Sequence, residues 1–389
     1  MFAQTAEAHS PQILLTPQRL RRLKLDRQRQ TMRWVNFENR VKTVPDSTER
    51  GFELALYYAI TTDEARGRAA IAWAKDHRCD RRQVALVLDW TNELLSEDER
   101  RTLSDESCAA GLDSSPATYR DVLFSKVARN EDLEDFVAET RRLLPEWIEV
   151  RKLSDANDLY AACEILSVVR HTEGIDLRQG AKDVFKQLPA EFLLRLKPRE
   201  MEHPGWMAHS AALALVDLDP NLESSQYLQG WALEDNQTVR EGPGVAYELL
   251  WADPYLPGVS YRNMDPWMYQ PGREFVARAD WNTDTCWIDI SQAGVQEDNC
   301  PAHWRDKSAP FGRLNLVPVS GTCVDVPARN SKQALMLWRL RPGQEFTYPN
   351  GEKTPALAEA DTLGLWQVPS NVEGKVCLKR EARTKEATR

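Results

Sequence analysis

The sequence predicts an α+β protein, in which a helical N-terminal part is followed by an antiparallel β domain, with the change near residue 242. Before that point, apolar residues recur at helical spacing between short polar breaks. After it, 11 of the 18 glycines and 7 of the 13 tryptophans fall within the last 148 residues, among short β-prone segments. A helical part and an aromatic-rich β part in one chain indicate two packed layers of different class.

The 389 residues are long enough for two domains, and a chain of this size buries enough surface to fold without a metal or disulfide staple. We expect no metal site, and the leading functional prediction requires no cofactor. The predicted divisions are a tail or signal-peptide remnant over 1–13, a helical domain over 14–241, a connector over 242–270, an antiparallel β domain over 271–379 and a charged tail over 380–389.

Capping signals indicate where helices begin in the helical part. Thr16 and Pro17 supply an N-cap and a first-turn proline for an opening helix that is expected to extend to about Val41. Ser96 and Glu99 have the spacing of a capping box. The short connections between the predicted helices favour antiparallel neighbours. Because no fixed sequence period marks a solenoid, we expect a layered or toroidal array of helical hairpins.

Short β-prone segments follow the connector. Residues 285–290 alternate between apolar and polar side chains, which is typical of a half-buried strand. Turn-forming pairs occur at Pro342-Gly343 and Asn350-Gly351. The other predicted strands are 275–279, 314–319, 334–340, 363–368 and 376–378.

Charge and composition exclude some partners. The net charge of −9 argues against nucleic acid, which requires a basic face, although a local arginine cleft can still bind an acidic substrate. No apolar run approaches 18 residues, so no membrane span is expected. The seven cysteines show no zinc-binding spacing, and one disulfide among Cys286, Cys300 and Cys323 is plausible in an oxidising compartment.

The first six residues, MFAQTA, are similar to the end of a secretory signal, in which a small residue precedes the cleavage point. They predict a periplasmic or secreted protein, with a cytoplasmic protein as the alternative.

Three segments carry a resemblance to a known family. They are LLTPQRL at residues 14–20, YELLWADP at 247–254 and REFVARADW at 273–281. With them the chain resembles the heparinase II/III-like and alginate-lyase-like proteins. The resemblance implies an α/α-toroid joined to a β-sandwich, and a polysaccharide lyase that cleaves uronic-acid glycosides by β-elimination. In that reaction a base removes the proton next to the carboxylate, donors neutralise the carboxylate, and an acid protonates the leaving oxygen.

The family usually carries an Asp-His-x-His-like stretch shortly after the last of these segments. Residues 292–303 here read QAGVQEDNCPAH, with one histidine, so no catalytic residue can be transferred by motif. Candidates therefore come from residue type and position. The candidates for catalysis are His209, Tyr247, Arg278 and His303. The candidates for sugar binding are the aromatic residues Trp206, Trp251, Tyr261 and Trp267.

Each candidate has a structural interpretation beside the functional one. His209 suits a base in a helical cleft, or else a histidine on the helix surface or in the core. Tyr247 suits a proton donor, or else packing. Arg278 suits a bidentate partner for a substrate carboxylate, or else an ion pair beneath the sheet. His303 suits a sugar-facing loop residue, or else an ordinary loop residue. The aromatic residues suit stacking on sugar rings, or else the core.

The leading prediction is an exported lyase that acts on an anionic polysaccharide. One alternative is a non-catalytic protein that binds glycan or a protein partner on the same scaffold. A second is an (α/α)-barrel glycoside hydrolase, which needs an acid pair such as Glu241 with Glu248 or Asp280 with Asp284. The sequence leaves open the glycan and the oligomeric state.

Overall fold

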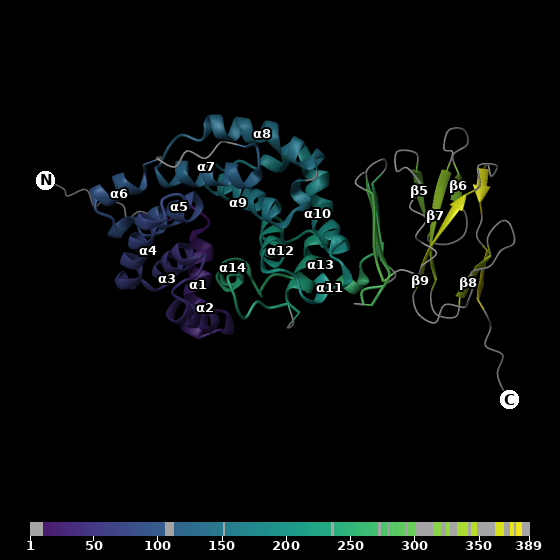
Figure 1. The fold of residues 1–389 in the computed structure, drawn as a ribbon, viewed down its shortest axis with the longest axis horizontal. Coiled ribbons are helices and arrows are strands. Elements are labelled where there is room, and N and C mark those ends of the chain that lie inside the picture. The colour runs from purple at the N-terminus through teal and green to yellow at the C-terminus, as the bar shows by residue number, and fades with distance from the viewer. Residues whose placement is uncertain are drawn as a thin grey trace. The chain divides into compact units, whose positions relative to one another are not determined.

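The computed structural model, shown in Figure 1, describes residues 11–105, 113–150, 152–234, 237–270, 274–278, 280–282, 284–291 and 294–299, together with the strand segments that follow them. Its contacts divide the chain into two compact units. The first, which we call the helical unit, comprises Met1–Pro189 and Pro204–Val259, and the second, the strand unit, comprises Ala190–His203 and Ser260–Arg389. Each is described by itself.

The part of the chain that is described is mostly helical before residue 252. The helices are α1 (Pro17–Arg29), α2 (Met32–Thr43), α3 (Arg50–Thr61), α4 (Glu64–Asp76), α5 (Arg81–Trp90), α6 (Glu97–Leu103), α7 (Pro116–Ala128), α8 (Glu134–Glu149), α9 (Ala156–Thr172), α10 (Lys182–Arg195), α11 (Pro198–Glu202), α12 (Trp206–Leu218), α13 (Glu223–Ala232) and α14 (Gly244–Trp251). None of these helices is long and apolar enough to cross a membrane.

Six of the helices form a closed series inside the helical unit. Helix α3 packs on α5, α5 on α7, α7 on α9, α9 on α12 and α12 on α14. The series returns to its start, because the rings of Phe52 on α3 and Tyr247 on α14 lie 4.9 Å apart between centroids. Helices α5 and α14 bury nearly every residue, and α3, α9 and α12 bury most of theirs. Helices that are buried on all sides belong to a core, so these helices form the interior of the unit.

The remaining helices of the unit are amphipathic and pack on that interior. Helix α2 buries only Trp34, Phe37 and Val41, and it contacts α14 and α3. Helix α4 packs on α3 in the same way, and α13 packs on α12. The array of helical hairpins expected from the short connections is therefore present, as pairs of one interior and one exterior helix.

The predicted capping signals are confirmed, but the predicted opening helix is wrong in its length. Thr16 accepts a hydrogen bond from the Arg19 amide, and Ser96 and Glu99 form the capping box. The helix ends at Arg29 rather than near residue 41. Gln30 adopts a left-handed conformation with φ of 52°, and the next residue, Thr31, caps a separate helix.

The strand unit begins with an antiparallel meander in the order β1-β2-β3-β4. A second sheet has the order β5-β7-β9, and two further pairs join β6 to β10 and β8 to β11. The strands are β1 (Trp267–Gln270), β2 (Glu274–Arg278), β3 (Trp287–Ser291), β4 (Gly294–Asp298), β5 (Leu314–Val319), β6 (Val324–Val326), β7 (Gln333–Leu340), β8 (Gln344–Thr347), β9 (Thr362–Val368), β10 (Gly374–Val376) and β11 (Lys379–Ala382).

One pair departs from the antiparallel domain that the sequence predicts. Strand β5 pairs with β7 in parallel, whereas β7 pairs with β9 antiparallel. The connection from β5 to β7 contains β6, which pairs elsewhere with β10, so the chain re-enters the sheet in its original direction. Parallel neighbours need such a crossover, which local alternation of side chains does not reveal.

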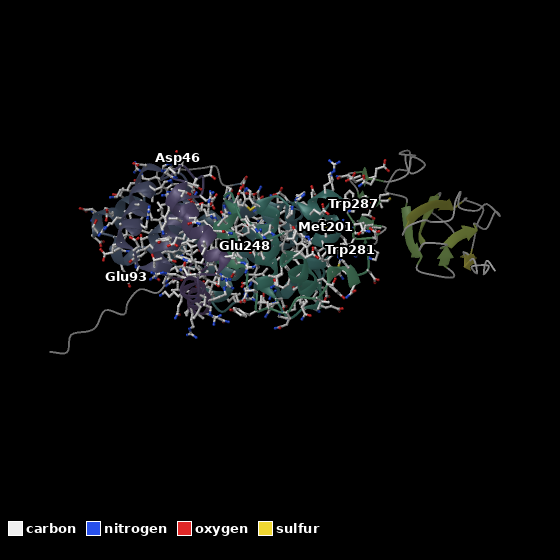
Figure 2. All side chains as sticks on the ribbon, turned by 90° about the horizontal axis from the view of Figure 1, so that it is seen from below. Asp46, Glu93, Met201, Glu248, Trp281 and Trp287 are labelled. Carbon is white, nitrogen blue, oxygen red and sulfur yellow. The ribbon has the colours of Figure 1, made fainter. Side chains whose placement is uncertain are left out.

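The end of α10 is bound to the meander within the strand unit. The indole nitrogen of Trp287 donates to the Leu194 carbonyl at 2.8 Å, and the Arg278 guanidinium donates to the Leu196 carbonyl at 2.5 Å. Figure 2 labels Trp287 among the side chains of this unit. A cation suits the carbonyl end of a helix. These bonds explain why residues 190–203 belong with the strands, although the sequence places them inside the helical domain 14–241.

Two cysteines, Cys79 and Cys286, are disulfide-bonded, and Cys163 is free. Cys163 is fully buried in α9, and burial raises the pKa of its thiol well above the ordinary range. It is therefore a small core residue rather than a reactive thiol.

Candidate functional site

A pocket of about 560 Å³ lies where the interior helices begin. We call it the N-terminal pocket, because its side chains come from the starts of α3, α5, α7, α9, α12 and α14 and from residues just before them. The lining residues are Glu49, Cys79, Asp80, Arg81, Arg82, Gln83, Ala117, Arg120, Asp121, Asn157, Tyr160, Met207 and Tyr247.

The helix ends around this pocket differ in how they are capped. Asp80, Ser115 and Asp155 accept hydrogen bonds from the first-turn amides of α5, α7 and α9. The starts of α12 and α14 have no side-chain cap, whereas the Phe52 amide in the first turn of α3 donates to the Gln83 side chain at 3.0 Å. Uncapped first-turn amides carry the positive end of the helix dipole, so the starts of α12 and α14 favour an anionic group nearby.

Tyr247 is the centre of a hydrogen-bond network in the pocket. Its hydroxyl donates to the Glu49 carboxylate at 2.6 Å and accepts from the Arg82 guanidinium at 3.0 Å. Burial raises the pKa of Tyr247 well above its usual value, against the opposing charge of Arg82. The phenol is therefore protonated at neutral pH. Burial also raises the pKa of Glu49, whereas Arg82 and the Tyr247 bond act in the opposite direction.

A buried carboxylate holds the cations of the network in place. Glu164 is fully buried and accepts from Arg82 at 2.7 and 3.2 Å. Arg120 also reaches Glu164, at 3.4 Å, and it pairs with Asp121 at 2.8 Å. Burial raises the pKa of Asp121, and the opposing effect of Arg120 is smaller, so the pKa is raised overall. Two arginines that share one buried acid are fixed in position, which gives the pocket a preorganised set of donors.

One of the residues predicted from the sequence lines this pocket, and two others contact residues that line it. Tyr247 lines it directly. The Trp206 ring packs on Tyr247, with centroids 5.2 Å apart. The indole nitrogen of Trp251 donates to the Tyr160 hydroxyl at 2.8 Å, and Tyr160 lines the pocket. Both tryptophans thus support pocket residues, and neither is among the lining residues themselves.

His209 does not line the N-terminal pocket. It is 1% exposed, and its Nε2 lies 2.8 Å from the Glu248 carboxylate, which also accepts from Arg33 at 2.6 Å. Burial alone would raise the pKa of Glu248, but the bonds to His209 and Arg33 lower it overall. The structure thus places His209 in a buried ion-pair cluster, which matches its structural interpretation.

The other predicted residues belong to the strand unit or lie outside the described side chains. Arg278 is fully buried, with its guanidinium 4.6 Å from the Trp281 ring centroid, and burial lowers its pKa to about 10. Tyr261 packs on the same ring at 5.2 Å. Because Arg278 is fully buried, it is not open to a substrate carboxylate. The Trp267 side chain and His303 lie outside the described residues.

Sequence reasoning missed Glu49, Arg82, Arg120, Asp121 and Glu164. A chain with 59 acidic and 50 basic residues offers too many carboxylate and arginine pairs for spacing to select these. One signal was available, because Glu164 interrupts the apolar run of α9, whose residues Leu159–Val169 are all buried. A lone acid on such a helix requires a buried partner, and this requirement points to an arginine from a neighbouring interior helix.

Within the described residues, no group of His, Cys, Asp and Glu could hold a metal ion. No protein-family model matches the chain, and no curated protein matches it at a significant level. The resemblance to polysaccharide lyases therefore depends on the quoted sequence segments alone.

Proposed function

We propose that this chain is a carbohydrate-active protein of lyase type, in which the closed series of helices is an α/α-toroid and the strand unit is its β-sandwich-like partner. The N-terminal pocket binds an acidic sugar unit of a polysaccharide and cleaves the chain there by β-elimination. The observation that carries this proposal is the Tyr247 phenol, held between the Glu49 carboxylate and the Arg82 guanidinium in an open pocket.

The proposed reaction uses these groups in turn. Glu49 removes the proton on the carbon next to the sugar carboxylate. Its pKa is raised towards neutral pH, which makes its carboxylate a stronger base. A carbon–carbon double bond forms as the bond to the leaving oxygen breaks, and Tyr247 gives its proton to that oxygen. The proton on Glu49 then returns to Tyr247 along their 2.6 Å hydrogen bond, which resets the site.

The charge of the substrate has its own partners in this scheme. The uncapped starts of α12 and α14 and the Arg120 guanidinium stabilise the substrate carboxylate and the charge that develops on it. Arg82 makes no substrate contact in this scheme and acts as a positioning residue for Tyr247.

Glycoside hydrolysis is the second candidate, and one observation favours it. Glu49 and Asp121 both line the pocket, and burial raises the pKa of each. Hydrolysis needs two carboxyl groups, one protonated and one ionised. The sequence-predicted acid Glu248 does not serve, because it is bound to His209 and Arg33.

We propose export to the periplasm or the exterior of the cell. The disulfides at Cys79 and Cys286 support this location, because disulfides persist in oxidising compartments. Cys79 also lines the N-terminal pocket, directly before the N-cap residue Asp80 of α5.

The test is to incubate the full chain with alginate, heparin, hyaluronan and pectin in water enriched in ¹⁸O. Elimination gives an unsaturated product that absorbs ultraviolet light and contains no oxygen from water, whereas hydrolysis gives a saturated product that carries ¹⁸O. Tyr247→Phe and Glu49→Gln are expected to abolish the elimination. The matched control is Tyr227→Phe, which removes a hydroxyl bonded to Glu223 on the exterior helix α13. Glycan binding without either product would instead identify a non-catalytic binding protein.

A further inference from the structure

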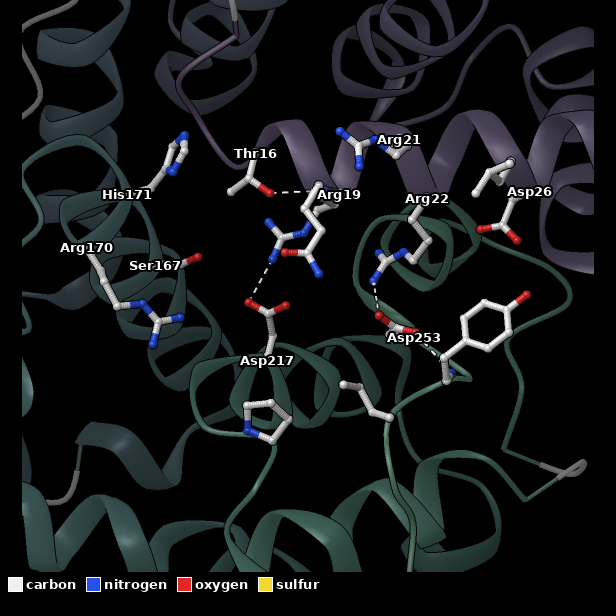
Figure 3. A pocket seen from close by; sticks show the side chains of 15 residues that line it. Thr16, Arg19, Arg21, Arg22, Asp26, Ser167, Arg170, His171, Asp217 and Asp253 are labelled. Carbon is white, nitrogen blue, oxygen red and sulfur yellow. Dashed lines mark hydrogen bonds and ion pairs between the residues drawn. The ribbon is translucent and has the colours of Figure 1, made fainter.

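A second cavity, of about 630 Å³, lies in the helical unit where the interior helices end. Its lining comes from α1 and from the C-terminal ends of α9, α12 and α14 (Figure 3). We propose that it is a binding site for an acidic sugar unit, separate from the N-terminal pocket. We call it the arginine cavity, after the residues Arg19, Arg21, Arg22 and Arg170 that line it.

The charges in the arginine cavity favour an anion. Four arginines and three aspartates line it, which leaves an excess of one positive charge. Two of the arginines are paired: Arg19 lies 2.7 Å from Asp217, and Arg22 lies 3.2 Å from Asp253, while the third aspartate is Asp26. Figure 3 shows both ion pairs as dashed lines.

Arg21 and Arg170 form no ion pair with any residue that the structure describes. Arg170 donates to the Leu218 carbonyl at 2.8 Å through one nitrogen only. A cationic excess in a protein of net charge −9 is a local feature, and it attracts ligands of opposite charge.

A buried donor in this cavity lacks an acceptor. Arg22 donates to the Leu250 carbonyl at 2.6 Å, but its Nε has no hydrogen-bond partner among the described residues and is shielded from solvent. A buried polar atom without a partner is costly. Because this nitrogen is shielded, an anion in the cavity would bind Arg21 and Arg170 instead.

An exposed aromatic ring completes the site. Tyr255 lines the cavity and is 70% exposed, and its hydroxyl accepts from Arg29 at 2.6 Å, which fixes the ring. Leu25, also at the cavity, is 41% exposed. An open aromatic face beside free guanidinium groups fits a ring that carries an acidic substituent. The anion preference follows from the cavity itself, whereas the choice of a sugar ring rests on the proposed function.

The arginine cavity is distant from the N-terminal pocket. Helix α9 contributes Asn157 and Tyr160 to the pocket and Arg170 and His171 to the cavity, and its 17 residues span about 25 Å. One small ligand therefore cannot occupy both, and the cavity binds its own ligand.

The test is calorimetric titration of the full chain with digalacturonate, with neutral cellobiose and with inorganic sulfate. We expect digalacturonate to bind and cellobiose not to bind. Arg21→Glu should weaken the cavity site about tenfold or more, because it replaces an unpaired cation with an anion. Arg141→Glu, a change of the same charge at an exposed arginine of α8, should leave binding unchanged. Tyr255→Ala should remove the advantage of digalacturonate over sulfate.

The outcomes separate this proposal from the proposed function. If Arg21→Glu and Arg141→Glu bind digalacturonate equally well, or if the wild-type chain binds cellobiose as tightly, the arginine cavity is not an acidic sugar site. Loss of all binding in Tyr247→Phe, with Arg21→Glu unaffected, would assign the ligand to the N-terminal pocket alone. If the chain shows no lyase activity but binds digalacturonate in a way that depends on Arg21, the arginine cavity is confirmed as a binding site and the proposed catalysis is wrong.

Discussion

Replacing Arg82 with Met removes the cation at the centre of the N-terminal pocket. Arg82 makes two bonds to Glu164, one to Tyr247 and one to Tyr160, and it lies 3.5 Å from Glu49. Without it, the fully buried Glu164 retains only the Arg120 contact at 3.4 Å. Breaking a buried ion pair on one side costs about 3–5 kcal/mol, because the remaining charge stays buried. We expect a loss of that size in the free energy of unfolding.

Urea denaturation followed by tryptophan fluorescence measures this loss. The matched control is Arg141→Met, which changes an exposed arginine and should stay within about 0.5 kcal/mol of the wild type. The double variant Arg82→Met with Glu164→Met removes both charges, so it should recover most of the lost stability. A single-variant loss below about 1 kcal/mol, or a double variant less stable than the single one, would refute the reasoning.

Three further predictions concern stability. Glu248→Gln should make stability fall less steeply in acid. The folded pKa of Glu248 is lowered from its ordinary value of 4.5, so its contribution to stability is present above pH 4.5 and is lost as pH falls through the folded pKa. Gly230→Ala should cost about 1–3 kcal/mol, because its Cβ would meet the Val259 carbonyl oxygen at 2.0 Å. Trp287→Phe should cost about 1 kcal/mol through the lost bond to the Leu194 carbonyl.

Each of these has its own check. For Glu248→Gln, the urea midpoints of the variant and the wild type are compared across a pH series. If the two curves run parallel, the prediction for Glu248 is wrong. Gly180→Ala is the control for Gly230→Ala, because nothing lies within 4 Å of its added Cβ. Equal stability of these two alanine variants would contradict the close approach to Val259. For Trp287→Phe, an unchanged unfolding midpoint would show that the hydrogen bond from the indole to the Leu194 carbonyl does not contribute to stability.

Local signals predicted the parts of this fold that depend on neighbouring residues. The caps at Thr16 and Ser96 were predictable because the side chain and the amide it binds are three residues apart. The division at Gln30 was not, because a left-handed residue of this type leaves no mark in the apolar periodicity. The parallel pairing of β5 and β7 depends on a crossover, and alternation of side chains is the same in both directions.

The candidate site required contacts between distant parts of the chain. Tyr247 was selected for its residue type and its position near the predicted junction, and it does line the pocket. Its partners Glu49 and Arg82 are supplied by the starts of α3 and α5, which meet α14 only when the helix series closes. His209 was selected for the same reasons, but its partner Glu248 places it in the interior. Residue type alone did not distinguish these two outcomes.

The chemistry assigned to the N-terminal pocket is tested most directly by incubating the full chain with a polyuronate. The quantity measured is the rate at which the unsaturated, ultraviolet-absorbing sugar accumulates. We predict a steady rise with the unaltered chain and with Tyr227→Phe, and none with Tyr247→Phe. A rise of the same slope with Tyr247→Phe, or no rise with any of the four polysaccharides, would contradict the assignment of the chemistry to the N-terminal pocket.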